Sequence, residues 1–269
     1  MKSIYIVVLT LLISCKPKEV KEVIVETPEI EVNNNSWEAK TWEHGDGPDL
    51  NYNILYPIRK VPGVKYPLLV FLHGAGERGN DNESQRIHIA PFLSSDSIRN
   101  HYPAYVVFPQ CPADERWSEV EVSDGKWMAK KGGGMSRPLK QVSALIDHLM
   151  ATEEVDKNRL YISGLSMGGY GTFAFLGEKG DAVAGAIAIC GGGDVDAVTR
   201  YAHVPIKIFH GAKDPVVPVA YSQELHKALV AAHAPDVQYI EFPEGGHGVW
   251  NESYDHPGLL KWLFAQSRK

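Results

Sequence analysis

Residues 160–168 read Leu-Tyr-Ile-Ser-Gly-Leu-Ser-Met-Gly, an apolar run that leads directly into the pattern G-x-S-x-G around Ser166. The apolar run predicts a strand, and the serine falls where that strand gives way to a helix. In this context the two glycines permit so sharp a reversal that the Ser166 hydroxyl is exposed above the end of the sheet. The N-terminus of the following helix favours negative charge developing beside it. The stretch therefore predicts Ser166 as a nucleophile.

Apolar runs alternate with segments of helical periodicity along most of the chain. The runs are apolar on both faces, which is typical of parallel strands covered by helices on both sides. They comprise residues 66–72, 104–108, 160–163, 184–190, 205–209 and 237–242. Helices are expected at 137–152, with Ser136 as N-cap, at 221–232 and at 258–266. The alternation predicts an α/β fold with a mostly parallel, doubly wound sheet that binds ligands at the carboxyl ends of its strands.

A candidate acid and base follow Ser166 in the chain order that serine hydrolysis on such a sheet uses. His247 lies among glycines just past the last predicted strand, in a loop that can bring its ring over the serine. Asp214 follows the strand at 205–209, where its carboxylate can accept a hydrogen bond from the far ring nitrogen of His247. Asp194, which follows the preceding strand, is the alternative acid. The sequence thus predicts Ser166, Asp214 and His247 as a catalytic triad.

Two backbone N–H groups are expected to bind the oxyanion that forms when a carbonyl carbon is attacked. One belongs to Met167, directly after the nucleophile. The other is expected in the loop His-Gly-Ala-Gly-Glu-Arg-Gly at residues 73–79, where small residues let the backbone approach a substrate closely. We expect Ala75 to supply it, with Gly76 as the alternative.

Four motifs in this order resemble the α/β-hydrolase superfamily, at residues 73–79, 164–172, 210–218 and 245–250. They are most similar to bacterial phospholipase/carboxylesterase-type enzymes and to the related feruloyl and acetyl xylan esterases. The resemblance covers roughly residues 42–264. It implies the α/β-hydrolase fold and a carboxylic ester hydrolase, and it is less specific for the substrate.

Three tryptophans are candidates for contact with substrate. Trp117 and Trp127 lie in the long connection at 111–136, where they could form a platform for a sugar or a phenolic acyl group or could pack the loop onto the sheet. Trp250, three residues after His247, could form a wall of the acyl pocket. The sequence has no H-E-x-x-H motif, no Cys/His cluster at ligand spacing, no phosphate loop and no dinucleotide fingerprint. We therefore expect neither a metal nor a cofactor.

The N-terminus is expected to be a targeting segment rather than part of the fold. Its charged start, short apolar stretch and Leu-Ile-Ser-Cys ending resemble a bacterial lipoprotein signal, with residues 1–15 as signal peptide and Cys15 as the lipidated residue. A plain signal peptide is the alternative. Residues 16–36 predict a flexible tether, and residues 37–269 the catalytic domain. This pattern favours a protein of the bacterial cell envelope that meets the membrane through its lipid anchor alone.

Cysteine usage and charge narrow the remaining possibilities. Cys111 and Cys190 follow strands that are not neighbours in the expected sheet, so two free thiols are predicted. The chain of 269 residues carries a net charge of −6 and no basic block, so nucleic acid is not an expected partner.

The sequence thus predicts a serine esterase that hydrolyses short-chain or carbohydrate-linked acetyl or feruloyl esters through an acyl-enzyme. Two alternatives remain open. One is a serine peptidase related to prolyl oligopeptidase, and the other is a non-catalytic carbohydrate-binding protein on the same scaffold.

Overall fold

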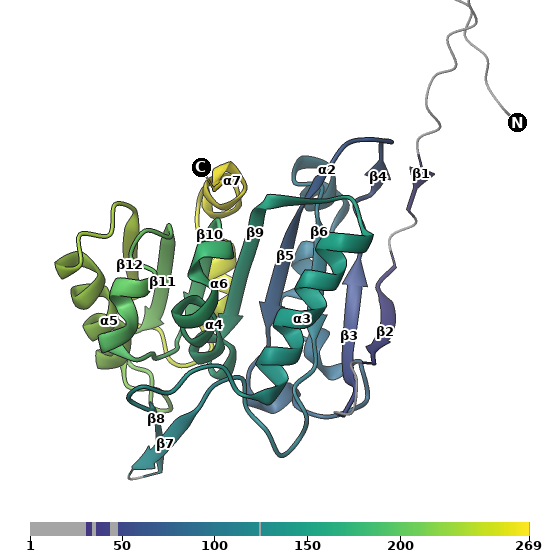
Figure 1. Ribbon diagram of the computed structural model, residues 1–269. Coiled ribbons are helices and arrows are strands. Elements are labelled where there is room, and N and C mark those ends of the chain that lie inside the picture. The colour runs from purple at the N-terminus through teal and green to yellow at the C-terminus, as the bar shows by residue number, and fades with distance from the viewer. Residues whose placement is uncertain (1–30, 34–35, 44–47, 124, 269) are drawn as a thin grey trace, which may run out of the picture.

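The computed structural model describes residues 31–33, 36–43, 48–123 and 125–268, and within them eight strands form one sheet (Figure 1). The strand order is β12-β11-β10-β9-β5-β6-β3-β2. Their bounds are β2 (Glu38–Trp42), β3 (Leu50–Leu55), β5 (Tyr66–Leu72), β6 (Tyr105–Pro109), β9 (Val155–Leu165), β10 (Gly185–Ile189), β11 (Ile206–Gly211) and β12 (Val237–Phe242). From β12 to β6 all neighbours are parallel, whereas β3 pairs antiparallel with both β6 and β2. This is the α/β-hydrolase architecture that the sequence predicts.

Helices cover both faces of the sheet. Figure 1 shows α3 (Arg137–Thr152), α4 (Met167–Lys179) and α5 (Val219–Ala231) across one face. The other face packs against α1 (Ala90–Leu93) and α7 (Leu259–Ala265) through Leu93 and Leu263. Two short helices, α2 (Asp96–His101) and α6 (Trp250–Tyr254), complete the set.

Strand β5 shows why its sequence is a continuous apolar run. Leu68, Val70 and Leu72 belong to the core beneath α3 and α4, whereas Leu69 and Phe71 belong to the core on the opposite face. Successive side chains of a strand point to opposite sides, so a sheet covered on both faces needs apolar residues at every position.

The predicted elements agree closely with the observed ones, apart from the antiparallel edge. The strands at 66–72 and 237–242 and the helix at 137–152 have the predicted bounds, and the remaining predicted elements begin or end within a few residues. The edge strand β2 and its neighbour β3 were not anticipated. Ser136 does precede α3 as its N-cap residue, but its side chain makes no capping hydrogen bond.

Both long connections contain secondary structure. The first, after β5, holds the 3₁₀ turns η1 (Ala75–Glu77) and η2 (Ser84–Arg86) followed by α1 and α2. The second, after β6, folds into a hairpin of β7 (Val120–Ser123) and β8 (Lys126–Ala129). Two further 3₁₀ turns, η3 (Gly180–Ala182) and η4 (Val195–Arg200), follow α4 and β10.

The predicted signal peptide and Cys15 lie outside the described residues, as does most of the predicted tether. At the end of that tether, β1 (Glu31–Val32) pairs with β4 (Arg59–Lys60), so these residues contact the domain. Among the described helices, none is long and apolar enough to cross a bilayer.

Cys111 and Cys190 are buried free cysteines, as predicted. They follow β6 and β10, which β5 and β9 separate in the sheet.

Candidate active site

Ser166 occupies a tight turn between β9 and α4 at the carboxyl end of the parallel strands. Its φ of 51° and ψ of −117° place it in a backbone conformation that L-residues rarely adopt. The flanking glycines make this turn possible. A Cβ on Gly164 would lie 2.2 Å from the carbonyl oxygen of Gly168, and a Cβ on Gly168 would lie 1.9 Å from that of Leu72. The predicted strained turn is therefore present, with Ser166 at the start of the helix.

A chain of hydrogen bonds joins Ser166 to the two predicted partners. The Nε2 atom of His247 lies 2.9 Å from Ser166 Oγ, and its Nδ1 atom lies 2.7 Å from Asp214 Oδ2. His247 comes from the loop between β12 and α6, and Asp214 from the turn after β11. The sheet thus brings together three side chains that are 33 and 81 residues apart in sequence.

Asp214 is surrounded by hydrogen-bond donors. Its Oδ1 atom accepts from the backbone N–H groups of Val216 and Val217, at 2.8 and 2.9 Å. Its Oδ2 atom lies 3.2 Å from Nε2 of His210, in addition to the contact with His247. Burial by itself would raise the pKa of Asp214, but these hydrogen bonds outweigh it and hold the pKa well below its usual range. The carboxylate is therefore ionised at neutral pH.

His210 is a contributor to this site that the sequence analysis did not identify. It is the penultimate residue of β11, is fully buried, and contacts Ser222 Oγ through Nδ1 at 2.7 Å. The motif that contains Asp214 begins with this histidine, four residues earlier, but only the folded turn brings the two side chains together.

Asp194, the alternative acid, lies elsewhere. Its carboxylate caps η4 by accepting from the backbone N–H of Asp196 at 3.0 Å, and it accepts from that of Gly132 at 2.8 Å. The structure therefore brings Asp214, and not Asp194, to His247.

The loop after β5 lies against the serine turn. A Cβ on Gly74 would be 3.7 Å from Ser166 Cβ. His73, which is buried, accepts at Nε2 from the backbone N–H of Cys111, so its proton is on Nδ1 and is donated to Gly74 O at 2.6 Å. Burial lowers the pKa of His73 to about 4, which keeps the ring neutral. Arg78 donates from Nε to Ala75 O at 2.9 Å. Both carbonyls of this loop are thus held in fixed directions.

The prediction that Trp117 contacts the substrate is wrong. The side chain is completely buried, and its indole N–H donates to His73 O at 3.0 Å. A Cβ on Gly171 would lie 2.6 Å from Trp117 Cβ, so the tryptophan packs tightly on the first turns of α4. Trp117 therefore fixes the loop to the sheet, the alternative considered from the sequence.

Trp250 lies beside His247, and the two rings meet edge to face with centroids 5.9 Å apart. Its other neighbour is His88, whose ring centroid is 4.8 Å away and whose Nε2 atom lies 3.2 Å from the buried carboxylate of Glu77. Trp250 thus lies beside the candidate base, and its role as a wall of the acyl pocket stays a prediction.

Cys190 also adjoins the site. Its thiol lies within 4.8 Å of the metal-ligand atoms of Asp214 and His247. Burial strongly raises the pKa of this thiol, so it remains protonated and is a poor metal ligand. Asp214 and His247 already satisfy one another by hydrogen bonding, and this arrangement suits proton transfer better than metal binding.

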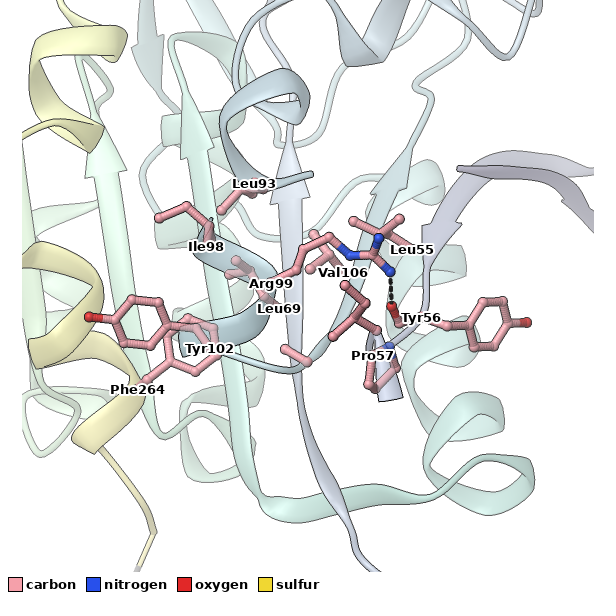
Figure 2. A pocket seen from close by; sticks show the side chains of 12 residues that line it. Leu55, Tyr56, Pro57, Leu69, Leu93, Ile98, Arg99, Tyr102, Val106 and Phe264 are labelled. Atoms are coloured by element: carbon pink, nitrogen blue, oxygen red, sulfur yellow. Dashed lines mark hydrogen bonds between the residues drawn. The ribbon is translucent and has the colours of Figure 1, made fainter. Parts of the chain in front are cut away.

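A separate cavity, far smaller than a substrate, is seen between β3, β6 and α2 (Figure 2). Its volume is about 10 Å³, about the space that one water molecule requires. Arg99 crosses it and donates to Tyr56 O at 2.9 Å, and Tyr102 and Phe264 close one side.

The fold and the hydrogen-bonded side chains define the class of this protein as the α/β hydrolases. The family model described as phospholipase/carboxylesterase matches residues 60–256, so the chain belongs to that family.

Individual relatives agree with this placement. A solved structure described as a thermostable esterase is 38% identical and superposes with a TM-score of 0.78, over 86% of this chain and 63% of that one. A bifunctional acetylxylan esterase/xylanase of Neocallimastix patriciarum is 28% identical over 178 residues, 65% of this chain and 22% of the relative. A ferulic acid esterase, 16% identical, has the same fold, with a TM-score of 0.62 over 85% of this chain and 98% of that one. This chain therefore spans less than two thirds of the first two proteins.

Proposed function

We propose that this protein is a serine esterase in which Ser166 is the nucleophile and His247 the general base. Asp214 orients His247 and stabilises its protonated form. The observation that carries this proposal is the unbroken chain of hydrogen bonds from Ser166 Oγ through both nitrogens of His247 to the buried Asp214 carboxylate. A nucleophile within hydrogen-bond reach of a base, itself oriented by a third group, is the arrangement that acyl transfer requires.

The proposed reaction has two halves. As Ser166 Oγ bonds to the ester carbonyl carbon, His247 Nε2 takes the hydroxyl proton and the carbonyl electron pair moves onto oxygen. The tetrahedral intermediate then expels the alcohol, which receives that proton from His247, and leaves an acyl-enzyme. A water molecule repeats the sequence, giving the carboxylic acid and regenerating Ser166.

Two backbone N–H groups are proposed to hold the oxyanion. Met167 is the first residue of α4, and the first N–H groups of a helix have no partner within it. His73 fixes the direction of Gly74 O, and a trans peptide unit points its N–H opposite to its carbonyl. The N–H of Ala75, in that same unit, is thereby held in one direction. Arg78 holds the N–H of Gly76 in the same way through Ala75 O, so Ala75 is the proposed donor and Gly76 remains the alternative.

Short-chain esters and carbohydrate-linked acetyl or feruloyl esters are the proposed substrates. The support comes from similarity to proteins named as acetylxylan esterase/xylanase and ferulic acid esterase. Trp250, beside His247, is proposed to form one wall of the acyl pocket.

The proposal is tested by comparing the purified protein with its Ser166→Ala variant. The substrates are 4-nitrophenyl acetate, methyl ferulate, acetylated xylan and an aminoacyl anilide. Ester turnover that disappears in Ser166→Ala is the expected result. Faster turnover of the anilide than of any ester would establish the peptidase alternative. Ester turnover that survives in Ser166→Ala would exclude the proposed nucleophile, and binding of xylan without any turnover would favour the non-catalytic alternative.

We further propose that the protein is a lipoprotein of the cell envelope, anchored through Cys15. The signal-like sequence of residues 1–15 supports this. The full chain expressed in bacteria should sediment with membranes and incorporate a labelled fatty acid, and Cys15→Ser should do neither. Equal fractionation of both proteins would favour a plain signal peptide.

A further inference from the structure

Trp250, which begins α6, contacts the rings of two histidines. Its ring meets that of His247 edge to face, with centroids 5.9 Å apart and an interplanar angle of 89°. Its centroid lies 4.8 Å from that of the His88 ring, and the two planes form an angle of 49°. Because His247 Nε2 lies 2.9 Å from Ser166 Oγ, a single side chain separates the Trp250 ring from the proposed nucleophile. An acyl group on Ser166 that extends along His247 therefore meets this ring.

The backbone of α6 is fixed independently of the Trp250 ring. Val249 and Tyr254 are buried in the core, and the Tyr254 hydroxyl donates to Ser163 Oγ of β9 at 2.8 Å. Ser253, which is also buried, donates to Val249 O at 2.6 Å. Trp250 itself is half-buried, so part of its side chain is accessible to a bound molecule. The helix thus holds the backbone of Trp250, whereas the neighbouring side chains select the direction of its ring.

His88 is held by a carboxylate of the loop beside Ser166. Its Nε2 atom lies 3.2 Å from Oε1 of Glu77, and a carboxylate oxygen accepts, so Nε2 is the donor. The side chains are only 28% and 11% exposed, so little water competes for this hydrogen bond. Glu77 Oε2 would lie 3.0 Å from a Cβ on Gly74, which would itself be 3.7 Å from Ser166 Cβ. The hydrogen bond therefore fixes the His88 ring relative to the serine turn.

The His88 ring in turn limits how the Trp250 ring can turn. Aromatic rings whose centroids are about 4.5–7 Å apart attract one another, and the distance of 4.8 Å between these two is at the close end of that range. A side chain that already has one orientation loses little conformational entropy when a ligand contacts it. His88 thus prepares the Trp250 ring as a fixed surface beside His247.

We propose that His88 is a positioning residue for acyl selectivity, which holds the Trp250 ring where a flat acyl group larger than acetyl contacts it. An acetyl group ends one bond beyond the carbonyl carbon and makes little use of this ring, whereas an aromatic acyl group gains a ring contact. The inference rests on the proposed serine esterase function and adds the residue that sets the preference among acyl groups.

Two esters with the same leaving group test this role. 4-Nitrophenyl acetate carries the small acyl group, and 4-nitrophenyl benzoate carries the larger flat one. His88→Gln keeps a side-chain N–H for Glu77 but removes the ring beside Trp250. It should lower kcat/KM for the benzoate about fivefold, the equivalent of one aromatic contact, and change kcat/KM for the acetate by less than about twofold.

His101→Gln is the matched control, because it makes the same substitution at an exposed histidine. His101 ends α2, shortly before β6 begins, at the end of the sheet opposite to Ser166. Its variant should match the parent on both esters.

Trp250→Ala tests whether His88 acts through the tryptophan. Removing the ring should itself lower kcat/KM for the benzoate by about fivefold or more. Adding His88→Gln to this variant should then cause no further loss, because two residues that act through one contact do not have additive effects.

An equal loss on both esters in His88→Gln would mean that His88 supports the fold or the catalytic loop, and would overturn the inference. So would benzoate turnover equal to or faster than that of the parent, or a further loss when His88→Gln is added to Trp250→Ala. A parent that hydrolyses the acetate but not the benzoate would also overturn it. Absence of acetate and benzoate hydrolysis by the parent would instead refute the proposed function, and the inference with it.

Discussion

Asp214 is the residue at which most of the interactions of the candidate site converge. Four donors surround its carboxylate, two from backbone N–H groups and two from the rings of His210 and His247. The backbone donors fix the carboxylate, which in turn selects the His247 tautomer that leaves Nε2 free to accept the proton of Ser166.

Asp214→Asn should therefore lower kcat by about 10⁴-fold, by analogy with the triad template, because an amide no longer favours that tautomer or stabilises the imidazolium. Steady-state hydrolysis of 4-nitrophenyl acetate measures the change. Asp194→Asn is the matched control, since its carboxylate binds backbone N–H groups of other loops, and its kcat should fall less than tenfold. A mild effect of Asp214→Asn with a large effect of Asp194→Asn would reverse the assignment.

At the scale of the element, the junction of β9 and α4 has no room for a side chain at Gly164 or Gly168. A Cβ on Gly168 would lie 1.9 Å from Leu72 O in the adjacent strand β5. The first turn of α4 can therefore lie this close to β5 only because residue 168 has no side chain. The same helix contains Gly177, whose Cβ would meet its nearest neighbour at an ordinary 3.9 Å. One helix thus provides both a forbidden and a permitted site for the same substitution.

Gly168→Ala should lower the free energy of unfolding by about 2–3 kcal/mol or more and abolish esterase activity, because either the strand or the serine turn must move. Gly177→Ala should raise it by about 0.5–1 kcal/mol, since alanine loses less conformational entropy in a helix. Urea denaturation and ester hydrolysis of both variants measure these effects. Equal stability of the two variants would contradict the steric argument.

At the scale of the whole molecule, burial of a neutral histidine couples stability to pH. The unfolded chain takes up a proton on His73 near the ordinary histidine pKa of about 6.5, whereas burial lowers the folded-state pKa to about 4. Between these values the unfolded state binds more protons, so the free energy of unfolding falls as pH falls.

Stability measured by urea denaturation should therefore decrease between pH 6.5 and 4, with about 3 kcal/mol from His73. His73→Gln keeps an acceptor for the Cys111 N–H but cannot titrate, so its stability should change much less over this range. The depressed pKa of Asp214 acts at lower pH, since its contribution is lost only as pH falls below about 4. A pH profile identical in the two proteins would exclude His73 as the source.

Prediction from sequence worked best where a local pattern has one physical solution. A run such as Tyr66–Leu72, apolar at every position, fits a strand covered on both faces. The serine turn can form only where glycines flank the serine, because side chains at these positions would clash with the neighbouring backbone. The antiparallel strands β2 and β3 were not predicted. Strand β2 lies at the edge of the sheet and is largely polar, like a loop, and β3, although mostly buried, contains Asn51 and Asn53, a residue type that is depleted in strands.

The sequence by itself determined the α/β class, the serine turn, and Ser166 and His247 as candidates with Asp214 or Asp194 as the acid. Strand and helix periodicity and the order of motifs are local properties of the chain. Only the tertiary structure decided that Asp214 rather than Asp194 meets His247, that His210 is a further neighbour of Asp214, and that Trp117 is buried. Each of these depends on contacts between residues far apart in sequence, and burial and hydrogen bonding are set by the neighbours that folding brings together.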